Sequence, residues 1–470
     1  MADKIPPQDI AIFGATGHLA RTQLWPAVYG LTTHSLLPQR GRIVGLARSD
    51  VGQDGFEDLV RQATVAAVGE RWDEGVWRRL SERLLFVPLA DSGYGELRRV
   101  LQEKERLLYL ATPPAAFGPT VRELAANGLV AGTRLMIEKP FGHDLKSALE
   151  LDQQLSEVLD ESQIYRIDHY LGKETVQGIL VFRFGNSVFE RVWNRDAIHH
   201  IDITVAESEG IEGRGAFYEG VGALRDVAEN HLLQVLSLLT MEPPARFDGE
   251  RVRDETAKLL AAMRPLNPRD VVRGQYTRGR VDGQEVPGYR DEPEIPADSQ
   301  TETFVAMKVE IDNWRWAGVP IYLRTGKRLA SHRTEIQIAF FDAPTSYFDK
   351  EGQRGMEPNR LVMRIQPEEE IEFTFLAKVP GPDVRLAPAS MKFSYGSTFG
   401  SEHVGAYERL LQEAMEGDHT LFVRADSVQR AWEIVQPVLD APGPVCFYEA
   451  GTWGPAEAEL LVAPLEWCLK

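Results

Sequence analysis

An acid, an imidazole, a phenol and an ammonium group lie within six residues, Asp168 to Lys173, in the sequence RIDHYLGKE. This run stands just ahead of a pattern typical of a helix. The N-terminus of a helix exposes N–H groups and the positive end of the helix dipole, so it attracts anions. His169 and Lys173 would add side-chain donors. The combination favours a phosphate dianion as ligand, and a solvated, charged helix start is the simpler alternative.

A second candidate group is His231, which falls on an apolar stripe at helical spacing. The stripe consists of Leu224, Val227, Ala228, Leu232, Val235, Leu236 and Leu239. An imidazole without a partner would cost about 1–3 kcal/mol there. A carboxylate on its second nitrogen would fix the tautomer and raise its basicity, and Asp168 is the candidate. A buried histidine with only a structural role is the alternative.

A glycine-rich turn follows the first apolar run, Ile10–Phe13, in the sequence GATGHLA. This is a G-x-x-G-x-x-A variant of the dinucleotide-binding fingerprint. Gly14 would permit the tight turn, Gly17 would let the backbone approach a pyrophosphate, and Ala20 would let helix pack on strand. An ordinary strand-to-helix loop is the alternative. The expected cofactor contacts in this turn are Gly14, Thr16, Gly17 and Leu19.

The second expected strand is followed by Arg48. A site selective for NAD usually carries an acid near this point, where it binds the ribose diol. A guanidinium can instead pair with a 2′-phosphate through charge-assisted hydrogen bonds, each worth about 1.5–3 kcal/mol. Arg48 therefore predicts NADP as cofactor, with NAD less favoured. A surface arginine without this role is the other interpretation.

The elements that would position these residues alternate between strand and helix over the first part of the chain, which predicts an α/β domain with a doubly wound parallel sheet. The expected strands are 10–13, 43–46, 107–110 and 135–137, and the expected helices are 19–31, 54–68, 73–83, 93–103, 116–127 and 144–160. Pro26 should kink the first helix or delay its regular start.

Beyond Asp168 long strand-like runs predict an α+β half with a large, mainly antiparallel sheet. The expected helices are 172–185, 224–240, 403–416 and 425–440, and the expected strands are 301–312, 319–325, 334–341, 359–366 and 370–378. Residues 265–299, rich in Pro, Gly and charge, are expected to form loops. We therefore predict a dinucleotide-binding domain over 1–168 and a substrate-binding and dimerisation domain over 169–470.

The composition limits the kinds of partner. A net charge of −18, from 52 basic and 70 acidic residues, argues against nucleic acid and membrane surfaces. Two cysteines in 470 residues form neither a disulfide framework nor a zinc cluster. The N-terminal stretch has no signal peptide and no segment reaches membrane length, so a cytoplasmic protein is expected.

Segments along nearly the whole chain resemble the glucose-6-phosphate dehydrogenase family. They include IFGATGHLA, VGLARS, IEKPFG, RIDHYLGKE, ITVAESEGIEGRG, RDVAENHLLQ, IDNWRWAGVP and YLRTGKRL. The resemblance implies a Rossmann-type domain followed by an α+β domain whose sheet forms a dimer interface. It also implies NADP-dependent oxidation of glucose 6-phosphate at carbon 1, to 6-phosphogluconolactone, in the pentose phosphate pathway. A homodimer or homotetramer is expected.

The resemblance also assigns roles to residues. His231 resembles the catalytic base, and Asp168 its orienting partner. The implied substrate-binding residues are His169, Tyr170 and Lys173 for the phosphate, together with Lys139, Glu207, Asp226 and Lys327. His332 is added as a substrate-binding candidate because it stands where the family has a further basic residue. Lys139 is implied to contact the coenzyme as well, and Tyr109 to lie beside it.

The chemistry of these residues agrees with the assignment. Oxidation of a sugar hemiacetal removes a hydride from carbon and a proton from the hydroxyl group, and histidine, with an unperturbed pKa of about 6.5, is suited to take that proton. No metal is required, and none is expected. His199 and His200 are adjacent in sequence, so their side chains should point apart.

One difficulty concerns Asp226, which lies five residues before His231. On an ideal α-helix this spacing separates two side chains by about 140°. Both can face one substrate only if the helix begins near Asp226, which we therefore expect close to the N-cap.

Four positions depart from the family pattern: Ala216 replaces the second residue of a usual glycine pair, and the other three change charge. His18 and Gln23 stand where an acid and a lysine are usual, and His332 where a second basic residue is expected. The same hydride transfer on a modified hexose phosphate is therefore the alternative function. A sugar oxidoreductase for unphosphorylated substrates, which would leave His169 and Lys173 without a purpose, and a binding protein without turnover are weaker alternatives.

Overall fold

The computed structural model describes residues 5–89, 93–343, 359–400 and 404–469. The chain forms two compact units. The first comprises Met1–Glu174, Pro244–Glu255 and His403–Gln429, and the second comprises Thr175–Pro243, Thr256–Glu402 and Arg430–Lys470. Two short pieces from the later part of the sequence thus belong to the first unit.

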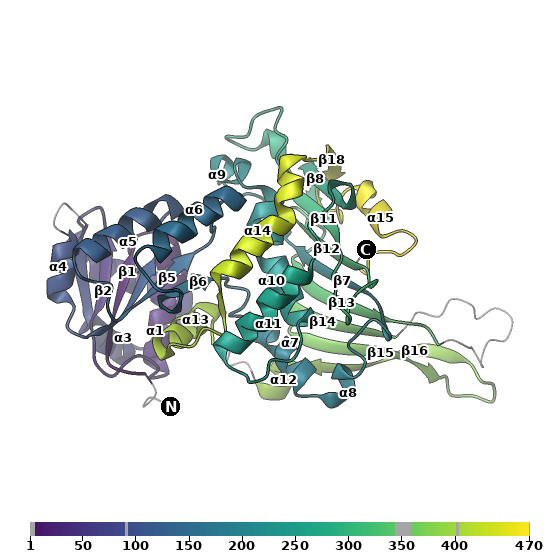
Figure 1. The fold of residues 1–470 in the computed structure, drawn as a ribbon, viewed down its shortest axis with the longest axis horizontal. Coiled ribbons are helices and arrows are strands. Elements are labelled where there is room, and N and C mark those ends of the chain that lie inside the picture. Colours follow the sequence, from purple (N-terminus) through teal and green to yellow (C-terminus); the bar gives the residue numbers. More distant parts are fainter. Residues whose placement is uncertain (1–4, 90–92, 344–358, 401–403, 470) are drawn as a thin grey trace. The chain divides into compact units, whose positions relative to one another are not determined.

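The first unit contains a sheet with the strand order β17-β6-β5-β4-β1-β2-β3 (Figure 1). Its strands are β1 (Gln8–Phe13), β2 (Ile43–Ala47), β3 (Leu84–Pro88), β4 (Glu105–Leu110), β5 (Thr133–Glu138), β6 (Ile164–Ile167) and β17 (Phe422–Val423). Every neighbouring pair is parallel except β17 and β6. The strand order reverses between β1 and β4, and ligands of such sheets bind outside the carboxyl ends of the strands at this point.

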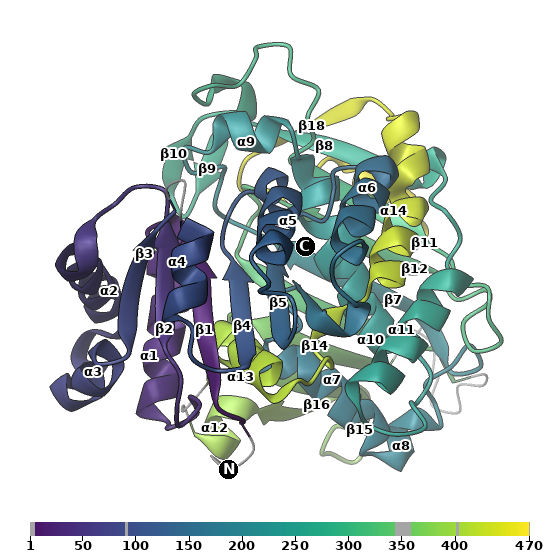
Figure 2. The same ribbon diagram turned by 60° about the vertical axis from the view of Figure 1, so that its left-hand side comes forward.

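Helices cover this sheet, and Figure 2 shows α4 and α5 in front of its strands. The helices are η2 (Ala20–Leu24), α1 (Trp25–Thr33), α2 (Gly52–Val68), α3 (Glu74–Ser81), α4 (Gly93–Val100), α5 (Phe117–Ala126), α6 (Leu145–Ser156) and α13 (Ala406–Glu416). Pro26 lies in the first turn of α1, directly after the π-helical segment η2. The expected delay in the regular helix is confirmed, because proline cannot donate the backbone hydrogen bond of a helix interior.

The parallel sheet is buried on both faces, as its nearly continuous apolar strands require. Every residue of β1 and of β2 is buried. The sequence analysis did not predict β3 or β6. Their runs, LLFVP and IYRI, are too short for periodicity to separate a strand from the end of a neighbouring helix.

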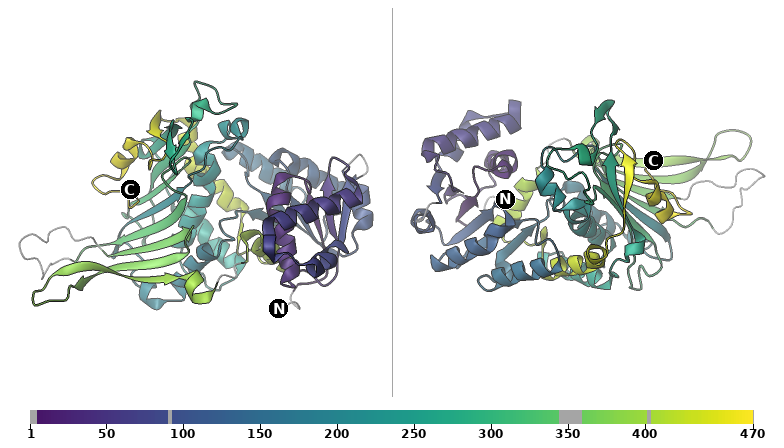
Figure 3. Two further views of the ribbon diagram at one scale, coloured as in Figure 1. Left: turned by 180° about the vertical axis from the view of Figure 1, so that it is seen from behind. Right: turned by 90° about the horizontal axis from the view of Figure 1, so that it is seen from above.

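The second unit is built on a sheet with the order β16-β15-β14-β13-β7-β12-β11-β8-β18, whose long strands Figure 3 shows side by side. The strands are β7 (Ile198–Ala206), β8 (Val271–Thr277), β11 (Phe304–Val309), β12 (Ile321–Gly326), β13 (Arg333–Phe340), β14 (Arg360–Gln366), β15 (Glu370–Lys378), β16 (Leu386–Ser394) and β18 (Val445–Glu449). Only the pairs β12–β7 and β18–β8 are parallel within this described sheet. The mainly antiparallel prediction is confirmed.

A buried helix packs against this sheet. It consists of the π-helical segment η6 (Leu224–Leu232), which packs against β11 and β12, and the helix α10 (Leu233–Thr240), in which every residue is buried. The indoles of Trp193 and Trp316 donate hydrogen bonds to the carbonyls of Leu239 and Thr240 at 2.8 and 2.7 Å. These bonds satisfy two of the carbonyls that the end of a helix leaves open.

Further helices complete the chain. They are α7 (Glu174–Phe184), α8 (Ser187–Glu190), α9 (Gly215–Glu219), α11 (Gly249–Ala262), α12 (Tyr395–Phe399), α14 (Ala425–Asp440) and α15 (Ala456–Val462). The expectation of loops over residues 265–299 is wrong in part, because β8 and the hairpin β9 (Gly279–Val281) and β10 (Gln284–Val286) lie there. These strands are stabilised by pairing with other strands, although the local content of Pro, Gly and charged residues favours loops. Among the described residues, no helix is long and apolar enough to span a bilayer.

Candidate active site

The glycine turn after β1 is built for close backbone approach. Gly14 has φ +78°, and a Cβ atom there would lie 2.3 Å from the carbonyl oxygen of Ala111, at the end of β4. The amide of Gly17 donates to the carbonyl of Gly14 at 2.9 Å, which closes the turn. Only glycine fits the first position, because any side chain would strike the backbone of the neighbouring strand. The turn therefore lies at the point where the strand order reverses.

Exposed polar and charged side chains lie in and near this turn. Arg48 directly follows β2, the strand beside β1, and is exposed. The guanidinium of Arg21 donates to the carbonyl of Thr16 at 2.9 Å and so lies over the turn. His18 and Gln23, two of the departures from the family pattern, are also exposed. These side chains are accessible to an anionic ligand in the parallel-sheet unit.

Tyr109 lies inside the sheet. It has no exposed surface, and its hydroxyl donates to Glu138 Oε1 at 2.5 Å. Burial raises the pKa of the Glu138 carboxyl, and hydrogen bonds from Tyr109 and Tyr407 partly offset this effect. Lys139 follows Glu138 at the carboxyl end of β5, and its peptide bond to Pro140 is cis. Tyr109 is therefore connected to the carboxyl end of β5 by its hydrogen bond to Glu138, and its own side chain is not exposed there.

The segment after β6 folds into consecutive tight turns. The carboxylate of Asp168, 2% exposed, accepts a hydrogen bond from the Tyr170 amide at 2.9 Å. The amide of Lys173 donates to the carbonyl of Tyr170 at 3.1 Å, and its ammonium lies 4.0 Å from the centre of the Tyr170 ring. His169 is half-buried, with its ring 5.2 Å from that of Tyr170. The helix α7 begins directly after these turns, at Glu174, so the expected position of the segment ahead of a helix is confirmed.

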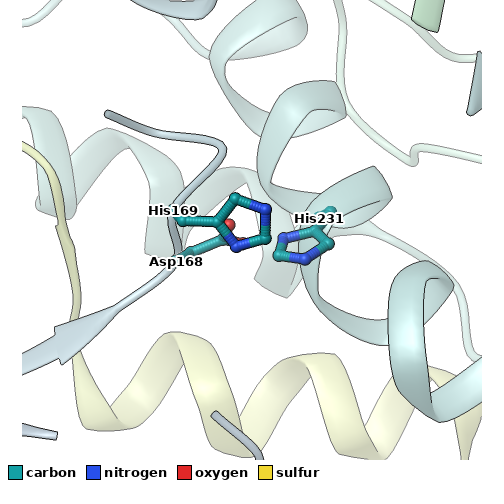
Figure 4. Close-up of side chains that lie close together, drawn as sticks. All are labelled: Asp168, His169 and His231. Atoms are coloured by element: carbon teal, nitrogen blue, oxygen red, sulfur yellow. The ribbon is translucent and has the colours of Figure 1, made fainter. Parts of the chain in front are cut away.

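His231 lies on η6 and is 2% exposed. Figure 4 shows Asp168 and His169 on the segment after β6 and His231 on its helix. The backbone of η6 is π-helical, so its hydrogen bonds run from residue i to i+5 and residues five apart lie one turn apart. Asp226 lies in the first turn of η6, two residues after its first residue, Leu224. The expected start of the helix near Asp226 is confirmed, and the π-helix removes the angular difficulty.

Glu207 and Lys327 follow the carboxyl ends of β7 and β12, which are parallel and paired at Ala206 and Gly326. The Lys327 ammonium bonds to the Glu207 carboxylate and lies 3.9 Å from Asp226 Oδ2. Lys327 is 5% exposed, so both carboxylates act on it with little solvent screening. Three of the predicted substrate-binding residues are thereby brought together in the second unit. The group offers both acceptors and a donor, as recognition of hydroxyl groups requires.

Tyr218, on α9, is a residue that the sequence analysis did not single out. Its ring faces the Lys327 ammonium at 5.2 Å. Its hydroxyl is buried and has no hydrogen-bond partner among the described residues. Burial raises the pKa of this phenol well above its usual value, and the charges of Asp226 and Glu207 act in the same direction. The sequence around Tyr218 contains no motif that indicates a role for it, because its contact partner Lys327 is distant in sequence.

His332 is held by two polar neighbours. Its Nδ1 lies 2.9 Å from Glu209 Oε2, and its Nε2 lies 2.9 Å from the amide nitrogen of Gln366. Partial burial acts to raise the pKa of the Glu209 carboxyl, but hydrogen bonds, chiefly from His332, bring it below its usual value. Arg333, the nearest substitute for a basic residue here, is paired with Glu335 and Glu368 at 3.6 and 3.8 Å.

The expectation that His199 and His200 point apart is wrong. Their Nδ1 atoms lie 2.8 Å from each other. The pairing of β13 with β7 shifts register at this point, so that Ala339 pairs with His200 and Phe340 with Ile198. Such a bulge inserts His199 into the strand and interrupts the alternation of side chains between the two faces.

Comparisons with known proteins cover the chain almost end to end. Residues 11–178 match the family described as glucose-6-phosphate dehydrogenase, NAD binding domain, and residues 180–467 match its C-terminal domain. The glucose-6-phosphate 1-dehydrogenase of Aggregatibacter actinomycetemcomitans is 43% identical, over 97% of this chain and 95% of its own length.

Two solved structures are similar throughout. The crystal structure of glucose-6-phosphate 1-dehydrogenase from Mycobacterium avium is 41% identical, with TM-score 0.88, and 99% of each chain is covered. A glucose-6-phosphate dehydrogenase in complex with its substrate glucose 6-phosphate is 36% identical, with TM-score 0.92, and all of each chain is covered. These matches extend over both units and therefore over all the predicted site residues.

Proposed function

Because the chain belongs to the glucose-6-phosphate dehydrogenase family and contains a domain for a pyridine nucleotide, we propose that it oxidises glucose 6-phosphate at carbon 1 to 6-phosphogluconolactone. The observation that carries the proposal is the group of Glu207, Asp226 and Lys327, which lies at the carboxyl ends of β7 and β12 and on the helix that bears His231. A solved relative of similar fold is described in complex with this sugar phosphate.

His231 is the general base in this proposal. It takes the proton of the carbon-1 hydroxyl group, and Asp168 orients its ring and stabilises the imidazolium. The bound nucleotide supplies the acceptor for the hydride. A positioned base of this kind contributes roughly 10²–10⁴-fold to the rate. Each of the two side chains is 2% exposed, and an electrostatic interaction between buried groups is weakened little by water.

The two ends of the sugar phosphate have different requirements. The phosphate would be bound by His169, Tyr170 and Lys173. Their side-chain donors lie directly before the N-terminus of α7, where backbone N–H groups also attract anions. Glu207, Asp226, Lys327 and Lys139 would bind the sugar hydroxyl groups. His332 would lie at the edge of this group, where Glu209 and Gln366 hold its ring.

NADP is the proposed nucleotide. The glycine turn fits a dinucleotide, since a Cβ at Gly14 would fill the close approach to β4. Gly14, Thr16, Gly17 and Leu19 would contact the pyrophosphate side, and exposed Arg48 would pair with the 2′-phosphate. Lys139 would lie at the coenzyme, and Tyr109 would act through Glu138.

We further propose, from the family resemblance, a cytoplasmic homodimer or homotetramer, which light scattering after size exclusion would measure.

A turnover assay tests the function. The purified chain is supplied with glucose 6-phosphate, glucosamine 6-phosphate, mannose 6-phosphate or free glucose, each with NADP or NAD, and the reduced nicotinamide is followed by absorbance. The proposal predicts the highest kcat/KM with glucose 6-phosphate and NADP. A higher value with another hexose phosphate, or no turnover with any of them, would contradict it.

A further inference from the structure

A group of potential metal ligands lies in the second unit, away from the residues discussed above. His200 and Asp202 occupy alternate positions on β7 and share one face of the sheet. The Cys468 thiol, near the C-terminus, donates to Asp202 Oδ2 at 3.2 Å, and His200 Nε2 lies 3.8 Å from the same oxygen. One ligand atom from each of the three residues lies within 4.8 Å of the other two. Asp202 is five residues from Glu207, about 16 Å along an extended strand.

The position of Cys468 is fixed by its neighbours. The buried guanidinium of Arg324 donates to the carbonyl of Leu469 at 2.8 Å and stacks over the Trp467 ring at 4.4 Å. The Trp467 indole donates to the carbonyl of Ala458, in α15, at 2.9 Å. The residues on both sides of Cys468 are therefore anchored to the sheet and to a helix, and its thiol is directed at Asp202.

The orientation of His200 is fixed as well. Its Nδ1 is engaged by Nδ1 of His199 at 2.8 Å, which leaves Nε2 toward Asp202. Contacts of the second nitrogen help to orient histidines that bind metals, and here His199 holds the ring so that Nε2 can act as the ligand atom. The ring is 6% exposed, so little solvent competes with a ligand at Nε2.

We propose that His200, Asp202 and Cys468 form a zinc site that joins the C-terminal segment to β7. An imidazole, a carboxylate and a thiolate are all ligands that Zn²⁺ accepts, with a water as the fourth. Bonds of about 2.0–2.3 Å in a tetrahedron place ligand atoms roughly 3.5 Å apart. The Cys468 Sγ–Asp202 Oδ2 and His200 Nε2–Asp202 Oδ2 separations, 3.2 and 3.8 Å, lie on either side of that value. The site goes beyond the proposed dehydrogenase function and does not depend on it.

The charges around the site set the conditions for binding. Coordination by the thiolate releases one proton, so Zn²⁺, the thiolate and the carboxylate together are neutral, whereas the metal-free group carries one negative charge. The guanidiniums of Arg324 and Arg360 act on Asp202. The carboxylates of Glu335 and Glu459 also act on Arg324. Affinity should therefore rise with pH as the proton is released, and it should fall when either acid beside Arg324 is neutralised.

Cobalt is a direct probe, because a tetrahedral Co²⁺–thiolate bond gives a charge-transfer band in the near ultraviolet. The full chain, freed of metal with a chelator, is titrated with Co²⁺. One equivalent per chain with this band is expected, and Zn²⁺ should displace it. Cys468→Ser should abolish the band, whereas Cys446→Ser, which changes the other of the two cysteines, should leave it unchanged. His200→Asn should weaken binding at least tenfold.

A second measurement needs no variant. Zn²⁺ should slow alkylation of Cys468 and leave that of Cys446 unaffected within the same molecule, as mapped by mass spectrometry. Zn²⁺ should also raise the Tm of the wild-type chain and of Cys446→Ser but not of Cys468→Ser. A folded wild-type chain that gives no thiolate band, or equal protection of both cysteines, would overturn the proposal.

Discussion

Asp226 and His231 lie five residues apart in a helix whose backbone hydrogen bonds also span five residues. In an α-helix the same pair would lie about 140° apart. In the π-helix they lie one turn apart, as residues four apart do in an α-helix. One helical segment can thus present a proton acceptor, His231, and a sugar-binding carboxylate, Asp226, in the same direction. The Lys327 ammonium, which lies 3.9 Å from Asp226 Oδ2, holds that carboxylate in place.

Asp226→Asn tests the role of this carboxylate. The substitution keeps the shape but removes the charge near Lys327, and a hydrogen bond to a charged group is worth about 1.5–3 kcal/mol. We expect KM for glucose 6-phosphate to rise roughly 10- to 150-fold, with a smaller change in kcat. Asp282→Asn, an exposed acid in a turn of the same unit, is the matched control and should leave both constants unchanged. A loss confined to kcat would contradict a binding role.

The π-helix marks the limit of prediction from sequence. The spacing of the apolar residues around His231 indicated a helix, and that helix exists. The same spacing did not distinguish an α-helix from a π-helix, and the segment packs against β11 and β12, which are distant in sequence. Glu207 and Lys327 posed a similar difficulty. They are 120 residues apart, and only the parallel pairing of β7 with β12 brings them together. The zinc ligands Asp202 and Cys468 are 266 residues apart.

Local signals were sufficient where a short segment forms its own structure. The glycine turn was predicted from its residues, and the segment after β6 was correctly placed just ahead of a helix, although its tight turns were not predicted. Strands β3 and β6 were missed for the opposite reason, since their positions are decided by pairing with β2 and β5. Tyr218 was missed because its contact with Lys327 depends on the whole sheet.

Arg48→Ala tests the coenzyme. Loss of a charge-assisted bond to a 2′-phosphate should raise KM for NADP roughly 10- to 150-fold and leave KM for NAD nearly unchanged. Arg40→Ala is the control, because Arg40 is equally exposed but precedes β2, at the opposite end of the strand from Arg48. The two coenzymes are titrated separately at saturating sugar phosphate. Equal losses for both would rule out pairing with the 2′-phosphate.

Tyr218→Phe separates binding from stability. It removes only a buried hydroxyl group that has no partner among the described residues, and it keeps the ring beside Lys327. If the hydroxyl bonds to the sugar, KM should rise roughly 2- to 12-fold. The Tm should not fall, because an unsatisfied polar group has been removed. A lower Tm with unchanged KM would show that the hydroxyl serves the fold instead.

His419 predicts a loss of stability in mild acid. Burial and the nearby Arg253 lower its pKa to about 4, and its ring stacks on Tyr165 at 4.1 Å. In the unfolded chain the imidazole takes up its proton at about pH 6.5. Its contribution is therefore complete above that pH and is lost as the pH falls toward 4. His419→Gln should show a smaller decrease in Tm than the wild type between these values. A parallel decrease in both would contradict the assignment.

The central claim is that His231 removes the proton of the carbon-1 hydroxyl group. The most direct measurement is single-turnover reduction of the nucleotide by His231→Asn, with the dissociation constant for glucose 6-phosphate measured on the same sample. We expect the rate constant to fall by roughly 10²–10⁴-fold while the dissociation constant changes little. A rate constant close to that of the wild type, at unchanged affinity, would contradict the account.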